Sequence, residues 1–183
     1  MQIANPFELL GMEARYAVAR PELDRVHREL SKTLHPDRHR DKPASERRLL
    51  LERAMQVNEA YRVVKDPVRR ARALLRLRGV VVDESVQVSP APAFLMDVIE
   101  QRETLAEARA TRNVEKIQAL RRDVTARREA TENHLGQAFD APADASDPET
   151  LLSLVAELNY DARFLEEAGA AIEELDVEPT ARA

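Results

Sequence analysis

The residue types that indicate chemistry most clearly in this sequence stand at His35-Pro36-Asp37. The tripeptide directly follows an apolar stripe that ends at Leu34, and proline disfavours a helical conformation in the residue before it. We therefore expect His35 to leave a helix and the tripeptide to lie in an exposed loop. The pattern His35-x-Asp37-x-His39 could also suggest a metal site, but two histidines and one carboxylate on an exposed loop lack the closed ligand set that such a site needs. Taken alone, the tripeptide also fits an ordinary helix-terminating turn.

A helix predicted from about Pro21 to Leu34 leads into this loop. Its apolar positions follow helical spacing and form one face: Leu23, Val26, Leu30 and Leu34. Its other face carries a basic stripe at positions i, i+3 and i+7: Arg25, Arg28 and Lys32. We therefore expect the acidic Asp37 to lie beside a basic helix face. A helix face that simply faces solvent would show the same basic stripe.

Three further helices are expected in the first half of the chain. The first spans about residues 6–11, with Asn5 as its cap and Pro6 at its first position. Another spans about 45–65, and the last begins at Asp66-Pro67. The helix at 45–65 should bury some combination of Leu49, Leu50, the stem of Arg53, Val57, Tyr61 and Val64.

The second half predicts three longer helices, at about 93–110, 113–138 and 148–175. Asn113 and Asp147 are suited to cap the second and third of them. The last helix has apolar residues near heptad spacing, typical of a bundle: Leu151, Leu154 or Val155, Leu158, Ala162, Leu165, Gly169, Ile172 and Leu175. Gly79 suits a helix C-terminus and Pro90 and Pro92 suit a linker, so we expect domains at 1–80 and 93–178 joined by residues 81–92.

Composition favours an all-α fold and excludes several classes of protein. The 183 residues include four Gly, seven aromatic residues and no Cys, which argues against an all-β fold, a disulfide scaffold and a thiolate metal site. No apolar run approaches the roughly 18 to 20 residues that span a bilayer, so we expect a cytoplasmic protein with no membrane contact. The sequence shows no nucleophile paired with a base, no glycine loop that could hold a phosphate and no paired carboxylates in a plausible pocket, so nothing in it indicates an enzyme. We also expect no cofactor and no metal.

The net charge of −5 divides unevenly along the chain. Residues 1–80 carry +7 and residues 81–183 carry −12. Such asymmetry suggests that each half meets a different kind of surface. Nucleic-acid binding by the basic half is a possibility that these counts alone leave open, but no stacking aromatic lies near the basic stripe and the acidic half would repel phosphate.

Two segments flank the tripeptide in the order and spacing of a J-domain, at Asn5–Gly11 and Val57–Ala71. The resemblance covers essentially residues 4–79. Arg72–Gly79 resembles the fourth-helix ending of the HscB-type J-domain co-chaperones, which assist iron-sulfur cluster assembly, and Phe94–Glu103 resembles that family's signature at the start of its C-terminal domain. The resemblance implies an all-α fold, with a helical hairpin and short flanking helices followed by a three-helix bundle.

The resemblance also implies two partners and the residues that contact them. A DnaK-type chaperone, HscA in dedicated bacterial systems, would bind His35, Pro36, Asp37, Arg25, Arg28 and Lys32 and be stimulated to hydrolyse ATP. The cluster scaffold protein would bind the C-terminal domain at Leu95, Met96, Ile99, Glu100, Glu103, Glu107 and Tyr160, with Phe164 as the competing choice for the last position.

Spacing alone places Met96, Glu100, Glu103 and Glu107 on one helical face, which could equally be the outer face of a bundle. A J-domain co-chaperone that delivers a different client is therefore an alternative. The sequence also leaves open whether the C-terminal helices form a weak homodimer.

Overall fold

The computed structural model describes residues 5–81, 89–143 and 145–177, and all regular structure within these ranges is helical. The predicted all-α fold class is therefore confirmed. The chain divides into two compact units, one of Met1–Asp83 with Phe139–Ala143, and one of Glu84–Ala138 with Asp144–Ala183. Among the described residues, no helix has both the length and the apolar character needed to cross a membrane.

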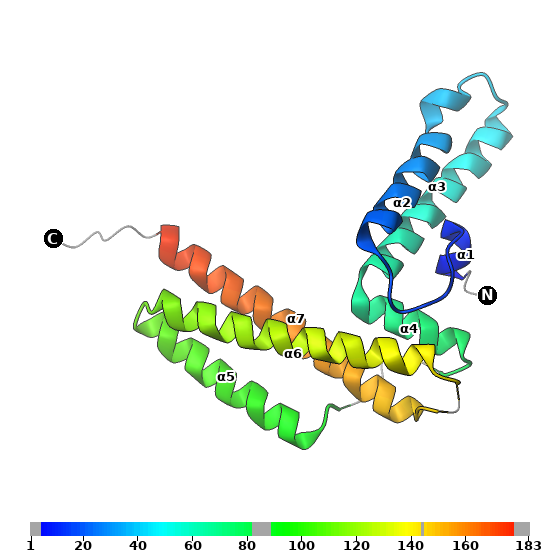
Figure 1. Ribbon diagram of the computed structural model, residues 1–183. Coiled ribbons are helices and arrows are strands. Elements are labelled where there is room, and N and C mark those ends of the chain that lie inside the picture. The colour runs from blue at the N-terminus through cyan, green and yellow to red at the C-terminus, as the bar shows by residue number, and fades with distance from the viewer. Residues whose placement is uncertain (1–4, 82–88, 144, 178–183) are drawn as a thin grey trace. The chain divides into compact units, whose positions relative to one another are not determined.

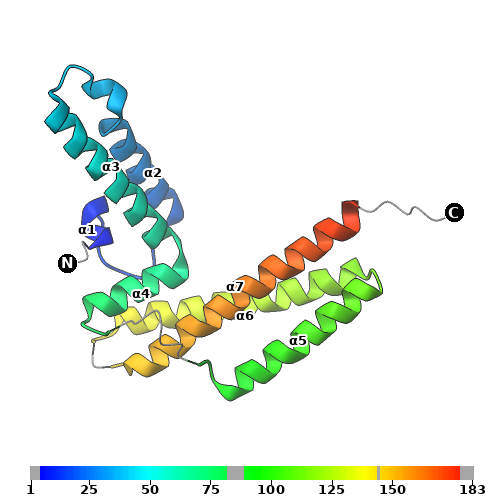
Figure 2. The ribbon, with the colours of Figure 1, turned by 180° about the vertical axis from the view of Figure 1, so that it is seen from behind.

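The first unit is built around a helical hairpin. Helix α2 (Arg20–Thr33) and helix α3 (Ala44–Lys65) run antiparallel and are joined through the short 3₁₀ helix η1 (Pro36–His39), as Figures 1 and 2 show from opposite sides. Two shorter helices, α1 (Pro6–Leu10) and α4 (Pro67–Leu77), complete the unit. The buried side chains come from all four α-helices and include Phe7, Leu23, Val57, Val64 and Leu75.

The predicted ends of α1 and α4 are confirmed by their capping bonds. The side chain of Asn5 accepts a hydrogen bond from the backbone N–H of Phe7 at 3.0 Å, and Asp66 caps α4 by accepting from the N–H of Arg69 at 2.9 Å. Gly79 follows α4 with a φ of 79°, a left-handed conformation that favours glycine. Local sequence signals were sufficient here because each bond joins residues within one turn.

Of the residues expected to be buried on α3 in some combination, those toward its C-terminal end form the core. Val57 and Val64 are buried, but Leu49 is 65% exposed and Arg53 is exposed. Helix α3 has 22 residues, whereas α2 has 14 and α1 has five. The two neighbours are too short to cover the whole length of α3, so its first turns retain exposed apolar side chains.

The second unit consists of three long helices, α5 (Pro92–Ala110), α6 (Val114–Asp140, of which residues up to Ala138 belong to this unit) and α7 (Pro148–Val177). The N-terminal caps expected at Asn113 and Asp147 are confirmed, since each side chain accepts a backbone N–H bond at 3.0 Å. Helices α5 and α7 run in the same direction, with ion pairs at the same spacing of 65 residues, Arg102–Glu167 and Arg109–Glu174. The core of this unit is formed by Leu105, Ala108, Ile117, Val124, Phe164, Ala168 and Ala171.

The most buried line on α7 differs from the predicted apolar stripe by one position over the second half of the helix. Leu165 and Ile172 are half-buried at the edge of the core, whereas Asp161 and Phe164 are almost fully inaccessible. Heptad spacing defines a face only to about one residue, and the contacts of the neighbouring helices select the line that is buried.

Candidate docking sites

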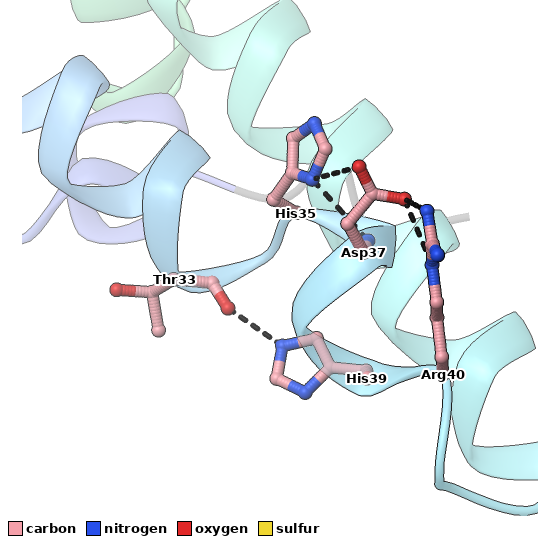
Figure 3. Close-up of polar contacts among 5 residues, drawn as sticks. All are labelled: Thr33, His35, Asp37, His39 and Arg40. Carbon is pink, nitrogen blue, oxygen red and sulfur yellow. Dashed lines mark hydrogen bonds and ion pairs between the residues drawn. The ribbon is translucent and has the colours of Figure 1, made fainter.

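The His35-Pro36-Asp37 tripeptide forms a capped turn at the end of the helical hairpin. Helix α2 ends at Thr33, and His35 adopts an extended conformation with φ −63° and ψ 129°, so that Pro36 starts η1. The Nδ1 atom of His35 accepts a hydrogen bond from the backbone N–H of Asp37 at 3.2 Å. Figure 3 shows this arrangement. His35 does leave the helix and the tripeptide is exposed, as expected, and the loop that contains it is ordered as a 3₁₀ turn.

The carboxylate of Asp37 is held by neighbours within the same turn. Oδ1 accepts hydrogen bonds from Arg40, with Nη2 at 2.6 Å and Nε at 3.2 Å, and Oδ2 lies 3.7 Å from His35 Nδ1. The Asp37 side chain is still 59% exposed. His39 is turned away from it, with Nε2 2.7 Å from the carbonyl oxygen of Thr33 (Figure 3). Among the described residues no group of three or more His, Cys, Asp or Glu side chains could hold a metal ion.

Arg40 was not identified as a site residue from the sequence. Its spacing of three residues from Asp37 was a visible signal, because such pairs meet on one side of a helical turn. The pairing depends, however, on residues 36–39 forming a helical turn, which the sequence analysis did not predict for this loop.

The basic stripe of α2 lies on the surface, with Arg25, Arg28 and Lys32 all exposed. Arg25 Nη1 donates to both carboxylate oxygens of Glu29 at 3.0 Å. At the end of α2, a shallow hollow of about 350 Å³ is lined by Ser31, Lys32, His35 and Arg38. The structure thus brings the last residue of the basic stripe beside the tripeptide and adds Arg38, which the sequence analysis did not single out.

A polar network fastens α2 to α3 behind this surface. The hydroxyl of Tyr61 donates to Asp24 Oδ1 at 2.8 Å, and Arg20 Nε donates to the same oxygen at 2.8 Å. The hydrogen bond from Tyr61 lowers the pKa of Asp24, and the same bond raises the pKa of Tyr61. His27 stacks on the Tyr61 ring with centroids 4.0 Å apart, and its Nε2 donates to Asn58 Oδ1 at 2.9 Å, which gives it a packing role.

The second candidate site is the outward face of α5. Met96 is 69% exposed and Ile99 is 57% exposed, while Leu95 is half-buried beside them. The carboxylates predicted on this face are exposed as well: Glu100, Glu103 and Glu107. Two large apolar side chains beside a row of carboxylates form a mixed surface of the kind found at protein–protein interfaces.

Glu107 differs from the other two carboxylates because it already has a partner. Its Oε2 lies 2.8 Å from Nζ of Lys116 on α6. This hydrogen bond and the charge of Lys116 lower the pKa of Glu107. Glu107 therefore meets any docking partner as half of an exposed ion pair.

The two aromatic candidates on α7 have different environments. Phe164 is 1% exposed and belongs to the core of the second unit. Tyr160 is half-buried, and its ring meets the edge of the Phe94 ring on α5 with centroids 6.2 Å apart. Of the two, only Tyr160 has surface that a partner could reach.

An antiparallel helical hairpin with His-Pro-Asp at its exposed turn, followed by a separate helical unit, defines the class of J-domain co-chaperones. Comparison with known proteins is more specific. The profile of the HscB C-terminal oligomerisation domain matches residues 90–169. The chain is 35% identical over 170 residues to a co-chaperone protein HscB homolog of Burkholderia multivorans, covering 93% of this chain and 95% of that protein. This chain belongs to the HscB family of co-chaperones.

Further relatives agree in sequence and in fold. An HscB homolog of Cupriavidus taiwanensis is 37% identical over 93% of this chain and 94% of its own length. The structure of chaperone HscB from Vibrio cholerae matches with a TM-score of 0.78 and 27% identity, over 93% of this chain and 99% of that one. Human co-chaperone HscB has a similar fold, with a TM-score of 0.80 at 22% identity, over 93% of this chain and 83% of that one.

Proposed function

We propose that this chain stimulates ATP hydrolysis by a DnaK/HscA-type chaperone through its tripeptide turn, and that it presents the iron-sulfur cluster scaffold protein to that chaperone. The observation that carries the first part is the position of Asp37, which is 59% exposed at the tip of the hairpin. Its carboxylate can accept charge-assisted hydrogen bonds from an arginine of the chaperone. The exposed cations of α2 supply the long-range attraction to an acidic surface.

In this proposal the chain acts by binding, and the catalytic residues belong to the chaperone. The turn at His35–Asp37 is held by the hydrogen bond from the Asp37 backbone N–H to the His35 ring, so little ordering of the backbone is needed when it docks. A preorganised acidic group beside a basic helix face can then stabilise the hydrolysis-competent state of the chaperone selectively, which is the requirement for shifting a conformational equilibrium.

The second part of the proposal is supported by the face of α5 that carries Met96 and Ile99. Both side chains are more than half exposed and lie beside carboxylates. Methionine adapts its shape to a partner, and carboxylates at the rim of an apolar contact select a partner with complementary charge. We propose the scaffold-binding set as Leu95, Met96, Ile99, Glu100, Glu103, Glu107 and Tyr160.

A single substitution tests the chaperone contact. We expect Asp37→Asn to reduce stimulation of the chaperone's single-turnover ATP hydrolysis at least about tenfold, because removing one partner of a desolvated interfacial charge pair costs roughly 2 to 5 kcal/mol. The exposed Asp41 in the same segment provides the control Asp41→Asn, which should retain stimulation. Full stimulation by Asp37→Asn with an unchanged fold would contradict the proposal.

Calorimetric titration against the cluster scaffold protein tests the second contact. Met96→Ala and Glu100→Ala should each weaken binding, by roughly tenfold for the methionine, because a central apolar contact is lost. Met55→Ala is the matched control, since Met55 is 65% exposed on α3 of the other unit. If the unaltered chain does not bind the scaffold protein, the delivered client is a different protein.

A further inference from the structure

One carboxylate of the second unit is removed completely from solvent. Asp161 on α7 has an exposed fraction of 0%, and it is the one buried acidic residue in the described part of the chain. A buried charge is costly unless it is paired and fully hydrogen-bonded. The residue that pairs with Asp161 therefore shows which helices this buried charge connects.

That partner is Arg127 of α6, which contacts both other helices of the bundle. Its Nε and Nη2 donate to the Asp161 carboxylate, with Nε 3.2 Å from Oδ1, and Nη2 also donates to Gln101 Oε1 on α5 at 3.0 Å. The guanidinium carbon lies 4.7 Å from the centroid of the Phe94 ring, which in turn meets the ring of Tyr160. One side chain thus connects α5 at two points and α7 at a third.

The three side chains on α5 and α7 that the Arg127 guanidinium bonds to or lies over are each the immediate chain neighbour of a proposed scaffold-binding residue. Successive residues of a helix point about 100° apart, so seating one of them in the interior sets the direction of the next. The neighbouring pairs are Phe94 with Leu95, Gln101 with Glu100, and Asp161 with Tyr160.

Other polar contacts between α5 and α7 do not have this geometry. Arg102–Glu167 and Arg109–Glu174 are also ion pairs between the two helices, but their side chains are 44% to 64% exposed. Exposed pairs between long side chains contribute little and tolerate rotation of the helices. The multidentate contact of Arg127, whose side chain is only 24% exposed and whose partner Asp161 is fully buried, leaves less freedom for such rotation.

We propose that Arg127 is a positioning residue for the scaffold-docking face: through Asp161, Gln101 and Phe94 it sets the rotation of α5 relative to α7 and so aligns the two parts of that face. This inference rests on the proposed scaffold binding. A buried ion pair is weak support for stability, and replacing it by apolar residues of similar size is often neutral or stabilising. The role of the Arg127–Asp161 pair in this protein is to orient the scaffold-docking face.

The decisive variant replaces both charges by apolar side chains, Arg127→Met with Asp161→Leu. Single substitutions would leave a buried charge unpaired and could unfold the bundle, whereas the double replacement keeps the interior apolar and filled. The control removes the exposed α5–α7 pair, as Arg109→Gln with Glu174→Gln. Each protein is unfolded with urea and titrated calorimetrically with the scaffold protein.

We expect the Arg127→Met/Asp161→Leu protein to keep its urea midpoint yet bind the scaffold at least about fivefold more weakly, while the control keeps both properties. Equal binding by the double variant and the unaltered chain would overturn the positioning role alone. Absence of binding by the unaltered chain would overturn the positioning role together with scaffold delivery. A loss of binding matched by an equal loss of stability would reduce Arg127 to a structural residue and so also contradict the inference.

NMR of the protein without the scaffold protein also tests whether Arg127 orients α5 and α7. In the isolated full chain, NMR signals of the Met96 methyl group and of the Phe94 and Tyr160 rings report the orientation of α5 and α7. The double variant should show broadened or multiple signals for these groups, whereas signals from the core around Phe164 should stay single. Unchanged, single signals throughout would show that the orientation does not depend on Arg127.

Discussion

Asp37 is positioned by bonds within its own turn rather than by burial. Arg40 contacts its Oδ1 atom with two nitrogens, and the His35 ring accepts the backbone N–H of Asp37. These contacts orient the carboxylate, but the bonds from Arg40 also engage Oδ1, one of the two oxygens that a chaperone arginine would use in the proposed contact. In the proposed contact, a chaperone arginine that binds Oδ1 would replace Arg40, and this exchange costs little because the internal pair is exposed.

This exchange predicts opposite effects for two neighbouring arginines. Arg40→Gln should lower the concentration needed for half-maximal stimulation of the chaperone about two- to threefold, because a competing surface pair of modest strength is removed. Arg38→Gln removes the same charge from the hollow beside Lys32 and should raise that concentration. Titrating each variant in the single-turnover ATPase assay measures the concentration needed for half-maximal stimulation. Equal changes for both variants would show that Arg40 acts only as a surface cation.

At the scale of the helix, α7 places two carboxylates one turn apart on its inner side. Asp161 is fully buried and is paired with Arg127, whereas Glu157 is half-buried. Burial raises the pKa of Glu157, and the nearby charge of Asp161 raises it further, against the opposing charges of Arg127 and His134. The folded state therefore holds the proton on Glu157 more tightly than the unfolded state does.

The sign of the resulting pH dependence follows from linkage. As the pH rises from the unfolded pKa of Glu157 to its higher folded pKa, the unfolded state releases its proton first, so the free energy of unfolding falls. Glu157→Gln should remove this decrease. The variant should be more stable than the unaltered chain at neutral pH, with the difference disappearing below the unfolded pKa.

Urea unfolding across this pH range measures the effect. Glu166→Gln, at an exposed position of the same helix, is the control and should show little difference from the unaltered chain at each pH. A stability difference for Glu157→Gln that did not vary with pH would contradict the assignment to its ionisation.

At the scale of the whole molecule, the two proposed contact surfaces belong to different units of the fold. The tripeptide turn and the basic face lie in the first unit, and the exposed apolar and acidic face lies on α5 in the second. The charge of the chain changes sign close to the first boundary between these units, with +7 in residues 1–80 and −12 in residues 81–183. Residues in separate units that share no partner are expected to contribute independently.

The two activities should therefore be separable by mutation. Asp37→Asn should bind the scaffold protein with unchanged affinity, and Met96→Ala should stimulate the chaperone normally when no scaffold protein is present. Calorimetry and the ATPase assay, each performed on both variants, check this expectation. A change of more than about threefold in the activity that a variant is expected to keep would show that the two units are coupled.

Most of the secondary structure was determined by the sequence itself. Helical periodicity, the caps at Asn5, Asp66, Asn113 and Asp147, and the proline at position 36 each act within a few residues, so their outcome could be derived without knowing the fold. The exposure of the tripeptide was also predictable, because the end of an apolar stripe coincides with a proline.

The tertiary structure alone decided which side chains lie inside. It selected Phe164 for the core and left Tyr160 partly accessible, left Leu49 exposed, and joined Arg127 to Asp161 and Gln101 across 34 and 26 residues of chain. Periodicity defines a helical face only to within about one position, and it contains no information about which faces meet. Those choices are made by packing and by the need to pair a buried charge, which act between residues distant in the sequence.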